Sequence, residues 1–492
     1  MQQTKTLHNN FPVDTDAYKI THHLGYRRGL ENLYSYGECR LGAKFSHVIP
    51  FGYQVHFWQS LVGQVVTPQL IEEAQDLSHS WFGHPYFNTD MWKYIINKHG
   101  GMLPIRIKAV PEGTRMPINN VMFTIEVLDN KCVPVVNHCE TELSHSWYPT
   151  TIASNSFEIK KDIYKRLVKT GTPEMIEYMC HDFGYRGTTC PQQAERGGMA
   201  HMINFRGSDT TRADRALRFY YGIAGKSILQ TVFATEHSVA EQFGGGEGEY
   251  DYVHNVLDKL PDGAIGSVVI DTYNALNFID NVITRPDIKE RILARNGKIV
   301  WRPDTGNPEE ISNRIINSLG HNFGYTFNDK SYKILNPKIG LIWGDGMDRK
   351  TIDSLHGSLN DNKWSSDNMV VGSGGGLLQK GFDRDTNRFA IKASYGVIDG
   401  NPVNMMKNPA TDKSKKSKTG MLKLHEANGK FSTLSSASET APMFNSYIDT
   451  MDTVLEMGQI VKEHTFDEIR KRADDAFHAS LKEDAMLEAE SA

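Results

Sequence analysis

The stretch GKIVWRPDTGNPEEISNRIINSLG, residues 297–320, contains one complete strand–loop–helix unit. The apolar run at 299–301 predicts a buried strand, and a polar turn follows it. Asn307 is placed to cap a helix, Pro308 suits its first position, and Gly320 is expected just past its end. Apolar residues at helical spacing form its buried stripe: Ile311, Ile315 and Leu319. The stretch therefore predicts a β-strand that leads directly into an amphipathic helix.

The same succession recurs between about residue 150 and about residue 385. Amphipathic helical stretches alternate with short apolar runs, which read IEYMCHDFG, SILQTVFATEH, AIGSVVID, KIGLIWGDG and NMVVGSGGG. Repeated strand–helix units imply a parallel sheet with helical crossovers. The sequence therefore predicts an α/β fold for this part of the chain.

Polar clusters follow these runs at six points where a strand should end: HDFGYRG, TEHS, IDTY, RPDTGNP, GDGMD and GSGGG. Asp and Gly are common turn residues, so a turn alone explains any one cluster. Six together favour one shared site, because the loops after the strands of a (β/α) barrel build its active site. An open doubly wound sheet is the alternative, since it also binds ligands at strand carboxyl ends.

The composition excludes several other classes of protein. The 492 residues carry a formal net charge of -5, which provides no bulk attraction to nucleic acid or to an anionic membrane. No apolar run is long enough to cross a bilayer, and the N-terminal MQQTKTLHNN lacks the apolar core of a signal peptide. The five cysteines form no C-x-x-C pair, so we expect reduced thiols in the cytoplasm.

The glycines at 372–376 are candidates for phosphate binding. Without Cβ atoms, backbone N–H groups can approach an anion closely, and a helix starting at Leu377 would add its positive end. A flexible turn without a ligand is the alternative. Gly344 and Asp345 open a second glycine-containing strand end, as in the phosphate grip of such barrels. GIAGKS at 222–227 lacks the first glycine of a P-loop and precedes a strand, so we exclude it.

Charged residues at three further strand ends complete the candidate site. Arg302 suits a phosphate or carboxylate, whereas Asp304 and Asp271 suit a sugar hydroxyl or Mg²⁺. An Arg–Asp pair that closes the barrel end is the structural alternative. Glu236 precedes His237, and a carboxylate beside a histidine orients it and makes it more basic. His237 is therefore a candidate general base or phosphoryl acceptor.

Aromatic and basic residues give weaker signals. Phe183, Tyr185 and Arg186 offer an aromatic face beside a cation, which suits a flat heteroaromatic ring, although a core phenylalanine is the plainer interpretation. Tyr18 and Arg40 are isolated signals of the same grade. The run DKSKKSKTG is either a solvated loop or a collector of polyphosphate through its lysines: Lys413, Lys415, Lys416 and Lys418.

Ten motifs together resemble the nicotinamide phosphoribosyltransferase family, which belongs to the type II phosphoribosyltransferases. They occur in the family's order and read DTDAYKITHH, YSYGECR, KAVPEG, SWYPTTIASNS, HDFGYRG, NFRGSDT, TEHS, RPDTGNP, GDGMD and GSGGGLLQK. The resemblance runs from about residue 14 to about residue 470, which is nearly the whole chain.

The resemblance implies an incomplete α/β barrel over residues 151–385. It also implies an α+β domain formed by both chain ends, 1–150 together with 386–492, in an obligate homodimer with active sites at the interface. Such enzymes join nicotinamide to phosphoribosyl pyrophosphate, giving nicotinamide mononucleotide and pyrophosphate in the first step of NAD salvage. The implied cofactors are Mg²⁺ and ATP as a co-substrate, with ATP hydrolysis coupled through phosphorylated His237.

The family motifs also imply roles for residues around the pyridine ring and the histidine. Phe183 and Tyr18 of the partner subunit would sandwich the ring, and Asp209 would accept a hydrogen bond from the carboxamide. Glu236 and Asp271 would orient His237, with Asp271 and Asp304 also serving ribose and Mg²⁺. The residues implied to hold phosphate are Arg186, Arg302, Gly374, Gly375 and Arg384, with Arg40 and the late lysines contributing across the dimer.

Three alternatives make different demands on these residues. An enzyme of this fold that uses nicotinate should lack Asp209, whose carboxylate would repel the acid while bonding the amide. A non-catalytic nucleotide-binding protein would not need His237, Asp271, Asp304 and both glycine clusters together. An aldolase would need a Schiff-base lysine at a strand end, and none of the six strand-end motifs contains one.

Overall fold

The structure is a computed structural model that describes residues 7–223, 225–411 and 415–491. The chain forms two compact units. The terminal unit comprises Met1–Ser154, Arg218–Gly222 and Phe382–Ala476, and the barrel unit comprises Asn155–Leu217, Ile223–Gly381 and Phe477–Ala492. None of the helices in the described ranges is both long and apolar enough to cross a membrane.

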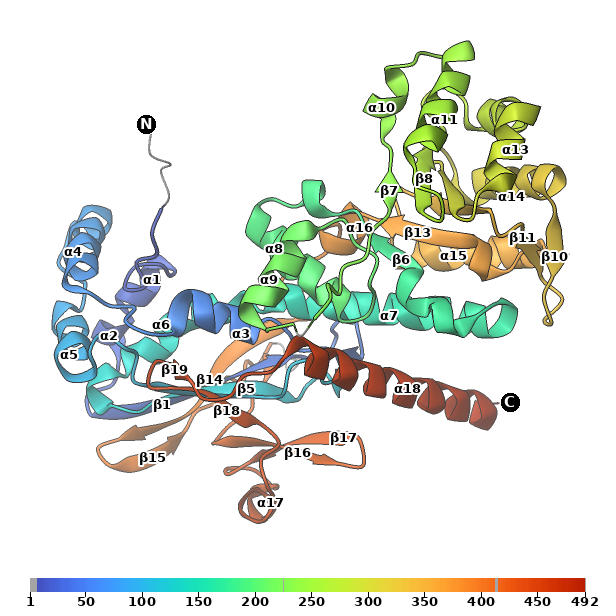
Figure 1. Ribbon diagram of the computed structural model, residues 1–492. Helices are drawn as coiled ribbons and strands as arrows, with labels where there is room; N and C mark the ends of the chain where they lie inside the picture. Colours follow the sequence, from blue (N-terminus) through green and yellow to red (C-terminus); the bar gives the residue numbers. More distant parts are fainter. Residues whose placement is uncertain (1–6, 224, 412–414, 492) are drawn as a thin grey trace, which may run out of the picture. The chain divides into compact units, whose positions relative to one another are not determined.

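The terminal unit is built on a seven-stranded antiparallel sheet (Figure 1). In sheet order the strands are β15 (Asn401–Asn404), β14 (Phe389–Ile398), β1 (Leu30–Cys39), β5 (Val121–Val127), β3 (Ile105–Ala109), β18 (Asp452–Glu456) and β19 (Gln459–Ile460). Strands of the N-terminal segment occupy the centre, and strands of the C-terminal segment flank them on both sides. The predicted α+β domain made from both segments is confirmed.

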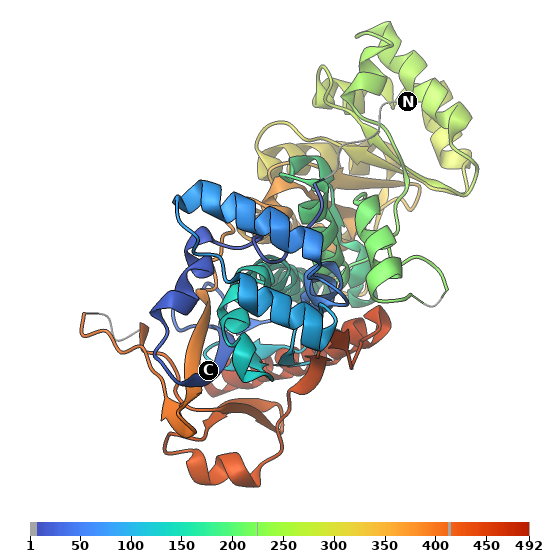
Figure 2. The same ribbon diagram turned by 90° about the vertical axis from the view of Figure 1, so that its left-hand side faces the viewer.

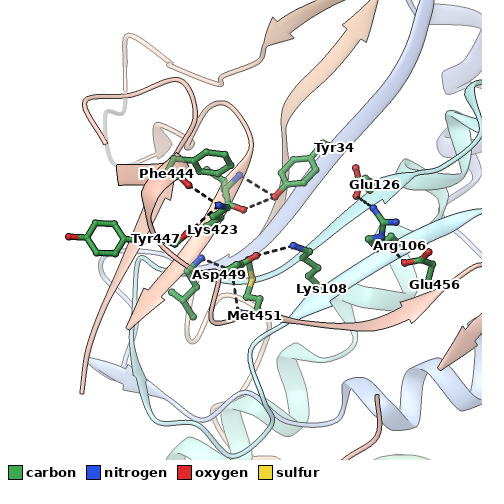
Figure 3. A network of polar contacts seen from close by, with 12 residues as sticks. Tyr34, Arg106, Lys108, Glu126, Lys423, Phe444, Tyr447, Asp449, Met451 and Glu456 are labelled. Atoms are coloured by element: carbon green, nitrogen blue, oxygen red, sulfur yellow. Dashed lines mark hydrogen bonds and ion pairs between the residues drawn. The ribbon is translucent and has the colours of Figure 1, made fainter. Parts of the chain in front are cut away.

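Alternation in sequence fixes which face of this sheet is buried. In β3 the apolar positions are buried and the two basic residues between them, Arg106 and Lys108, are partly exposed. Arg106 lies opposite an acidic residue on each neighbouring strand, and it binds Glu126 of β5 at 3.1 Å and Glu456 of β18 at 2.8 Å (Figure 3). Register and charge pairing therefore agree on the order of these strands.

The terminal unit also contains two small sheets and several helices. The sheets are β2 (His47–Val48) with β4 (Met116–Pro117), and β16 (Leu422–Ala427) with β17 (Lys430–Ser435). The helices are α1 (Ala17–Ile20), α2 (His22–Gly25), α3 (Tyr53–His56), α4 (Pro68–Phe82), α5 (Thr89–His99), α6 (Pro134–Ser144) and α17 (Ala441–Ser446). Figure 2 shows α4 and α5, in blue, packed side by side.

Polar contacts join the C-terminal hairpin to the N-terminal strands (Figure 3). Asp449 accepts hydrogen bonds from Lys108 Nζ at 3.2 Å and from the backbone N–H of Leu424 at 3.1 Å. The hydroxyl of Tyr34 donates to the carbonyl of Leu422 at 3.0 Å. Because Tyr34 is buried, these bonds satisfy groups that would otherwise be costly to remove from water.

The barrel unit is built on a six-stranded parallel sheet. In sheet order the strands are β6 (Cys180–Asp182), β13 (Met369–Ser373), β12 (Ile339–Trp343), β9 (Lys298–Arg302), β8 (Ile265–Val269) and β7 (Phe233–Ala234). From β7 to β13 the spatial order follows the chain without a reversal, so the doubly wound alternative, which needs one, is wrong.

Isolated bridges continue the parallel sheet beyond β6. Asp182 pairs with Ser208, and Gly207 pairs with Gln230, which lies just before β7. The sheet therefore curls back toward its other edge with fewer regular strands than the roughly eight of a complete barrel. The predicted incomplete α/β barrel is confirmed.

Helices connect the parallel strands, as the alternating sequence pattern predicts. They are α8 (Pro191–Met202), α9 (Thr211–Tyr220), α10 (His237–Glu241), α11 (Glu247–Lys259), α12 (Ala275–Asn277), α13 (Pro286–Ala294), α14 (Pro308–Phe323) and α15 (Arg349–Asp361), and α16 (Gly375–Leu378) follows the last parallel strand. A hairpin, β10 (Tyr325–Phe327) and β11 (Lys333–Leu335), follows α14. Two long helices, α7 (Trp147–Thr170) and α18 (Phe466–Ser491), continue from the terminal unit into the barrel unit.

The predicted division of the chain differs from these units at the C-terminus. It assigns all of residues 386–492 to the terminal segment, whereas residues from Phe477 on lie in the barrel unit. The ring of Phe477 packs edge-on against Phe157 and Tyr164, with centroids 5.9 and 5.2 Å apart. The helical pattern of the tail marks a helix, but not the unit against which its apolar face packs.

The start of α14 is the one predicted from the opening stretch. The side chain of Asn307 accepts hydrogen bonds from the backbone N–H groups of Glu309 and Glu310 at 3.0 and 3.1 Å, and Pro308 occupies the first helical position. These bonds satisfy donors that have no partner within the helix.

The end of α14 differs from the prediction. Gly320 was expected past the helix, but the helix continues to Phe323, and Gly324, with φ of 83°, ends it. A Cβ at Gly320 would lie 2.6 Å from the ring of Trp364, which is fully buried. Gly320 is therefore present to let this ring approach the helix.

We expect Gly320→Ala to destabilise the protein by about 1–3 kcal/mol, because the buried Trp364 cannot retreat. The matched control is Gly357→Ala in α15, where the added Cβ meets only the guanidinium end of Arg166 at 3.2 Å. Its effect should be neutral or stabilising by up to about 1 kcal/mol, since alanine favours helix. Denaturant unfolding midpoints measure both, and equal midpoints would contradict the packing argument.

Candidate active site

A pocket of about 400 Å³ lies at the carboxyl ends of the parallel strands. Four strand ends supply most of its lining, which consists of Phe183, Tyr185, Arg186, Asp209, Ala234, Thr235, Glu236, Val239, Arg302, Asp304 and Gly344. All of these residues belong to the barrel unit. The structure therefore brings together the sequence-predicted residues that follow β6, β7, β9 and β12.

Phe183 is held in the pocket by the glycine run. A Cβ at Gly372 would lie 2.3 Å from the ring of Phe183, so only glycine leaves room for this ring. The backbone N–H of Phe183 donates to the carbonyl of Ser373 at 2.9 Å, and the guanidinium of Arg302 lies 5.7 Å from the ring centroid. One face of the ring is thus fixed by the strand beside it and lies near a cation.

The other glycines of the run have different environments. A Cβ at Gly376 would lie 2.1 Å from the carbonyl oxygen of Met347, so this glycine permits a close backbone approach. Gly375 has no neighbouring atom within 4 Å of that position, and the nearest atom to a Cβ at Gly374 is 3.4 Å away. Only Gly374 and Gly375, the two predicted phosphate contacts, are therefore open enough for a ligand to approach their backbone.

Asp209 is positioned and kept ionised by its neighbours. One of its carboxylate oxygens accepts hydrogen bonds from Thr231 Oγ1 and from His181 Nε2, the latter at 3.0 Å. Burial acts to raise the pKa of Asp209, but the bond and the charge of His181 and the bond of Thr231 outweigh it, and the pKa lies below its usual value. Asp209 therefore presents a negative charge to the pocket at neutral pH.

His237 lies between a hydroxyl and two carboxylates. Its Nδ1 is 3.1 Å from Thr272 Oγ1, its Nε2 is 3.2 Å from Asp304 Oδ1, and the same Nε2 is 3.7 Å from Asp271 Oδ1. The side chain is 38% exposed, so a reagent can reach the ring.

Glu236, which the family motifs imply orients His237, has a different partner. Its carboxylate accepts a hydrogen bond from Ser238 Oγ at 2.5 Å. Glu236 is the N-cap of α10, and His237 is its first helical residue. The ring nitrogens of His237 contact Thr272 and Asp304, with Asp271 slightly farther away at 3.7 Å, and sequence reasoning missed Thr272 although it lies in the IDTY motif.

Asp271 and Asp304 form a close pair of carboxylates. Asp271 Oδ2 accepts a hydrogen bond from the backbone N–H of Asp304 at 3.0 Å. Burial first, and the charge of Asp271 second, raise the pKa of Asp304 above its usual value. Asp271 Oδ1 is buried without a hydrogen-bond partner among the described residues. Such an unpaired acceptor, with His237 and Asp304 close by, is suited to a cation.

Three predicted phosphate residues differ in their surroundings. Arg302 donates one bond to the carbonyl of Thr235 and lines the pocket, and Arg186 is exposed at its edge. Asp345 has an exposed side chain, and its backbone carbonyl accepts a bond from Trp343 Nε1 at 2.7 Å. Asp345 therefore shapes the loop beside Gly344, while the two arginines supply positive charge.

The remaining predicted residues, Tyr18, Arg40 and Arg384, lie in the terminal unit. Tyr18 is 59% exposed. The pKa of Lys392 is lowered, mainly because the side chain is buried. The positive charges of Arg40, Arg384 and Lys407 lower this pKa further, whereas the negative charge of Glu140 raises it. The four basic residues form a cationic cluster, defined as Arg40, Arg384, Lys392 and Lys407. Sequence reasoning missed its two lysines, although Lys392 stands in the apolar strand FAIKASYG.

One lysine of the basic run at 413–418 makes contacts within the terminal unit. Lys418 binds the buried Glu38, and its backbone N–H donates to Tyr36 at 2.8 Å. Lys415 and Lys416 lie among the described residues, whereas Lys413 lies outside them. At least one of the four lysines therefore holds the loop against β1 rather than facing a ligand.

A parallel barrel whose strand-end pocket combines an aromatic face, cations and paired carboxylates defines an α/β-barrel enzyme. Residues 178–464 match the nicotinate phosphoribosyltransferase (NAPRTase) family, and residues 10–107 match the nicotinamide phosphoribosyltransferase N-terminal domain. A nicotinamide phosphoribosyltransferase of Xanthomonas campestris pv. campestris is 36% identical over 475 residues, which cover 95% of this chain and 99% of that protein. One of Acinetobacter baylyi is 30% identical over 394 residues, 76% of each chain.

Solved structures share the fold at low identity. Nicotinate-nucleotide pyrophosphorylase from Pyrococcus furiosus superposes with a TM-score of 0.59 and 14% identity, covering 96% of this chain and 98% of that one. Human nicotinic acid phosphoribosyltransferase superposes with a TM-score of 0.54 and 14% identity, covering 94% of this chain and 93% of that one. The chain belongs to the nicotinate phosphoribosyltransferase (NAPRTase) family, and it is a phosphoribosyltransferase.

We expect Gly372→Ala to weaken binding of a ring substrate, because the added Cβ displaces the ring of Phe183. Gly375→Ala is the matched control for this site, since its Cβ enters open space; it should leave ring binding unchanged and act on phosphate binding alone. Steady-state kinetics with each substrate varied in turn separates the two effects. Equal rises in the KM for the ring substrate in both variants would refute the assignment.

Proposed function

We propose that this enzyme transfers the phosphoribosyl group of phosphoribosyl pyrophosphate to nicotinamide. The products are nicotinamide mononucleotide and pyrophosphate, the first step of NAD salvage. The single observation that carries the choice of amide is the ionised Asp209, held at the pocket by His181 and Thr231. Its carboxylate accepts a bond from a carboxamide N–H₂ and repels the carboxylate of nicotinate. The names of the relatives at 36% and 30% identity support the same choice.

The aromatic substrate lies against Phe183 in this proposal. The ring nitrogen attacks the anomeric carbon, the new C–N bond forms, and the C–O bond to pyrophosphate breaks with its electron pair leaving on oxygen. Positive charge develops on the ribosyl centre during this exchange, and the carboxylates of Asp271 and Asp304 face it. Arg302 and Arg186, with the open backbone at Gly374 and Gly375, hold the phosphate groups.

The enzyme acts as a homodimer in this proposal, as the family motifs imply. Tyr18 of the partner subunit covers the second face of the ring. The cationic cluster gives the terminal unit a surface for polyphosphate, to which Arg384 contributes within the chain and Arg40 of the partner subunit contributes across the dimer. We also place the enzyme in the cytoplasm, which suits its five free cysteines.

Asp271 and Asp304 fit a Mg²⁺ ion. Both offer carboxylate oxygens, the ligands that this cation prefers, and Asp271 Oδ1 is buried without a hydrogen-bond partner in the described part of the chain. When bound, Mg²⁺ supplies charge neutralisation for the departing pyrophosphate. The role of the two aspartates themselves is to position that charge beside His237.

ATP hydrolysis is coupled to the reaction through His237 in this proposal. A ring nitrogen attacks the γ-phosphorus of ATP, the bond to the β,γ-bridging oxygen breaks, and ADP leaves with that electron pair. Water later takes the phosphoryl group from the histidine, releasing inorganic phosphate. Asp304 and Thr272, which contact the two ring nitrogens, hold the imidazole in place for both steps.

We expect Asp209→Asn to admit nicotinate and to slow turnover of nicotinamide about 10- to 100-fold, because one charge-assisted hydrogen bond is lost. Asp287→Asn is the matched control: its carboxylate also pairs with a histidine, His254, at 2.9 Å, but it lies outside the pocket lining. Mononucleotide products from each acid or amide, measured by chromatography, give the result. Unchanged discrimination in Asp209→Asn would refute this account of specificity.

We expect His237→Ala to keep basal synthesis of nicotinamide mononucleotide and to lose its stimulation by ATP, because no acceptor for the phosphoryl group remains. ADP release and mononucleotide formation are measured in the same reaction. His321→Ala, an exposed histidine on α14, is the control and should keep the coupling. Full ATP stimulation in His237→Ala would exclude the phosphohistidine while leaving the transferase assignment intact.

A further inference from the structure

Two histidines and one glutamate converge in the terminal unit, apart from every residue assigned to the reaction. His56 is the last residue of α3, Glu142 lies in the last turn of α6, and His145 directly follows α6 as its C-cap. Glu142 and His145 are three residues apart, a spacing that places both side chains on one side of a helix end. The third side chain comes from a different helix, so tertiary packing brings the three together.

The distances between the three side chains are short. His56 Nδ1 lies 2.9 Å from Glu142 Oε1, and His145 Nδ1 lies 3.6 Å from Glu142 Oε2. The two imidazole centroids are 5.9 Å apart, and one donor atom from each residue falls within 4.8 Å of the others. Ligands bound tetrahedrally at about 2.0–2.1 Å are separated by about 3.3 Å, a value between the two observed separations.

The exposure of the cluster also suits a cation. Each carboxylate oxygen of Glu142 faces an imidazole nitrogen, Oε1 that of His56 and Oε2 that of His145. The side chain of His56 is 1% exposed, that of Glu142 17% and that of His145 50%, so the cluster is buried at one end and open to solvent at the other.

We propose that His56, Glu142 and His145 form a binding site for a divalent transition-metal ion, of which zinc is the probe. Two imidazoles and one carboxylate are a donor set for zinc, and water completes the coordination on the side of His145. Mg²⁺ prefers oxygen ligands, so this site is chemically distinct from the aspartate pair of the barrel unit. The bound ion cross-links α3 to α6 and stabilises the terminal unit.

A second cluster of the same unit is less suitable. His99, Asp129 and Cys132 also place donor atoms close together, but Asp129 already accepts bonds from Tyr94, His99 and the backbone of Lys131. Burial raises the pKa of the Cys132 thiol to about 12, so it is a neutral, poor ligand.

The test is metal binding by the full-length protein after chelator treatment, in buffer with excess Mg²⁺ to fill oxygen-rich sites. Zinc stoichiometry is measured by equilibrium dialysis, and Co²⁺ is used separately because its visible absorption reports nitrogen ligands and geometry. The variants are His145→Ala, which alters a half-exposed residue, and Glu142→Gln, which keeps the size of the side chain. The control is His254→Ala, which removes a histidine paired with a single carboxylate.

We expect the wild type and His254→Ala to bind one more equivalent of zinc than His145→Ala and Glu142→Gln. Affinity for that equivalent should fall at least about 100-fold in both variants, more than loss of an outer contact causes. Zinc should raise the Tm of the wild type and not of these variants. Equal stoichiometry in the wild type and His145→Ala, or a Co²⁺ spectrum that the variants do not change, would overturn the proposal.

Discussion

The parallel hydrogen-bond ladder of the barrel unit is the constraint on which the active site depends. Its strands all point the same way, so their carboxyl ends meet at one edge even though their sequences are far apart. Backbone bonds continue past the strand ends: Phe183 N–H donates to Ser373, Ile270 N–H to Arg302, and Gly344 N–H to Pro303. The loops that carry the functional groups are therefore extensions of the sheet, which limits how far each side chain can move.

Close packing then decides what each loop can offer. The glycine run illustrates this, because its members look equivalent in sequence and are not equivalent in the structure. Gly372 makes room for the ring of Phe183, and Gly376 makes room for the backbone at Met347, while Gly375 faces open space. The same run thus fixes the aromatic face of the pocket and leaves a short stretch of backbone free for an anion. A loop that tolerated larger residues at every position could leave backbone free for an anion, but it could not hold the ring of Phe183 in place.

The sequence predicts those features that depend on local patterns. Asn307 caps α14 because its side chain reaches N–H groups two and three residues on, and the alternation of strand and helix specifies the barrel. It fails where a distant partner decides the outcome. Position 320 inside α14 needs glycine because of Trp364, and Phe477 packs in the barrel unit against Phe157. None of these partners is visible from spacing along the chain.

In the site, too, local sequence predicts some features, whereas contacts with distant residues determine the others. Motif positions such as His237, Asp271 and Asp304 are recognisable, since each follows a strand and bears a chemically distinctive group. The partners that tune them are not: Thr272 contacts His237, and His181 holds Asp209, through contacts that only the folded barrel creates. The sequence does not identify Lys392 as a site residue for a different reason. A lysine inside an apolar strand is usually read as facing solvent, and only the structure shows its cationic neighbours.

The two neighbouring carboxylates, Asp271 and Asp304, concentrate negative charge at this site. The pKa of Asp304 is raised by burial and by Asp271, so the native protein takes up more protons than the unfolded chain between the ordinary and the raised pKa. Stability therefore falls as pH rises through that window. A positive charge beside the two carboxylates offsets their mutual repulsion. The carboxylate pair therefore favours bound states in which positive charge lies beside it.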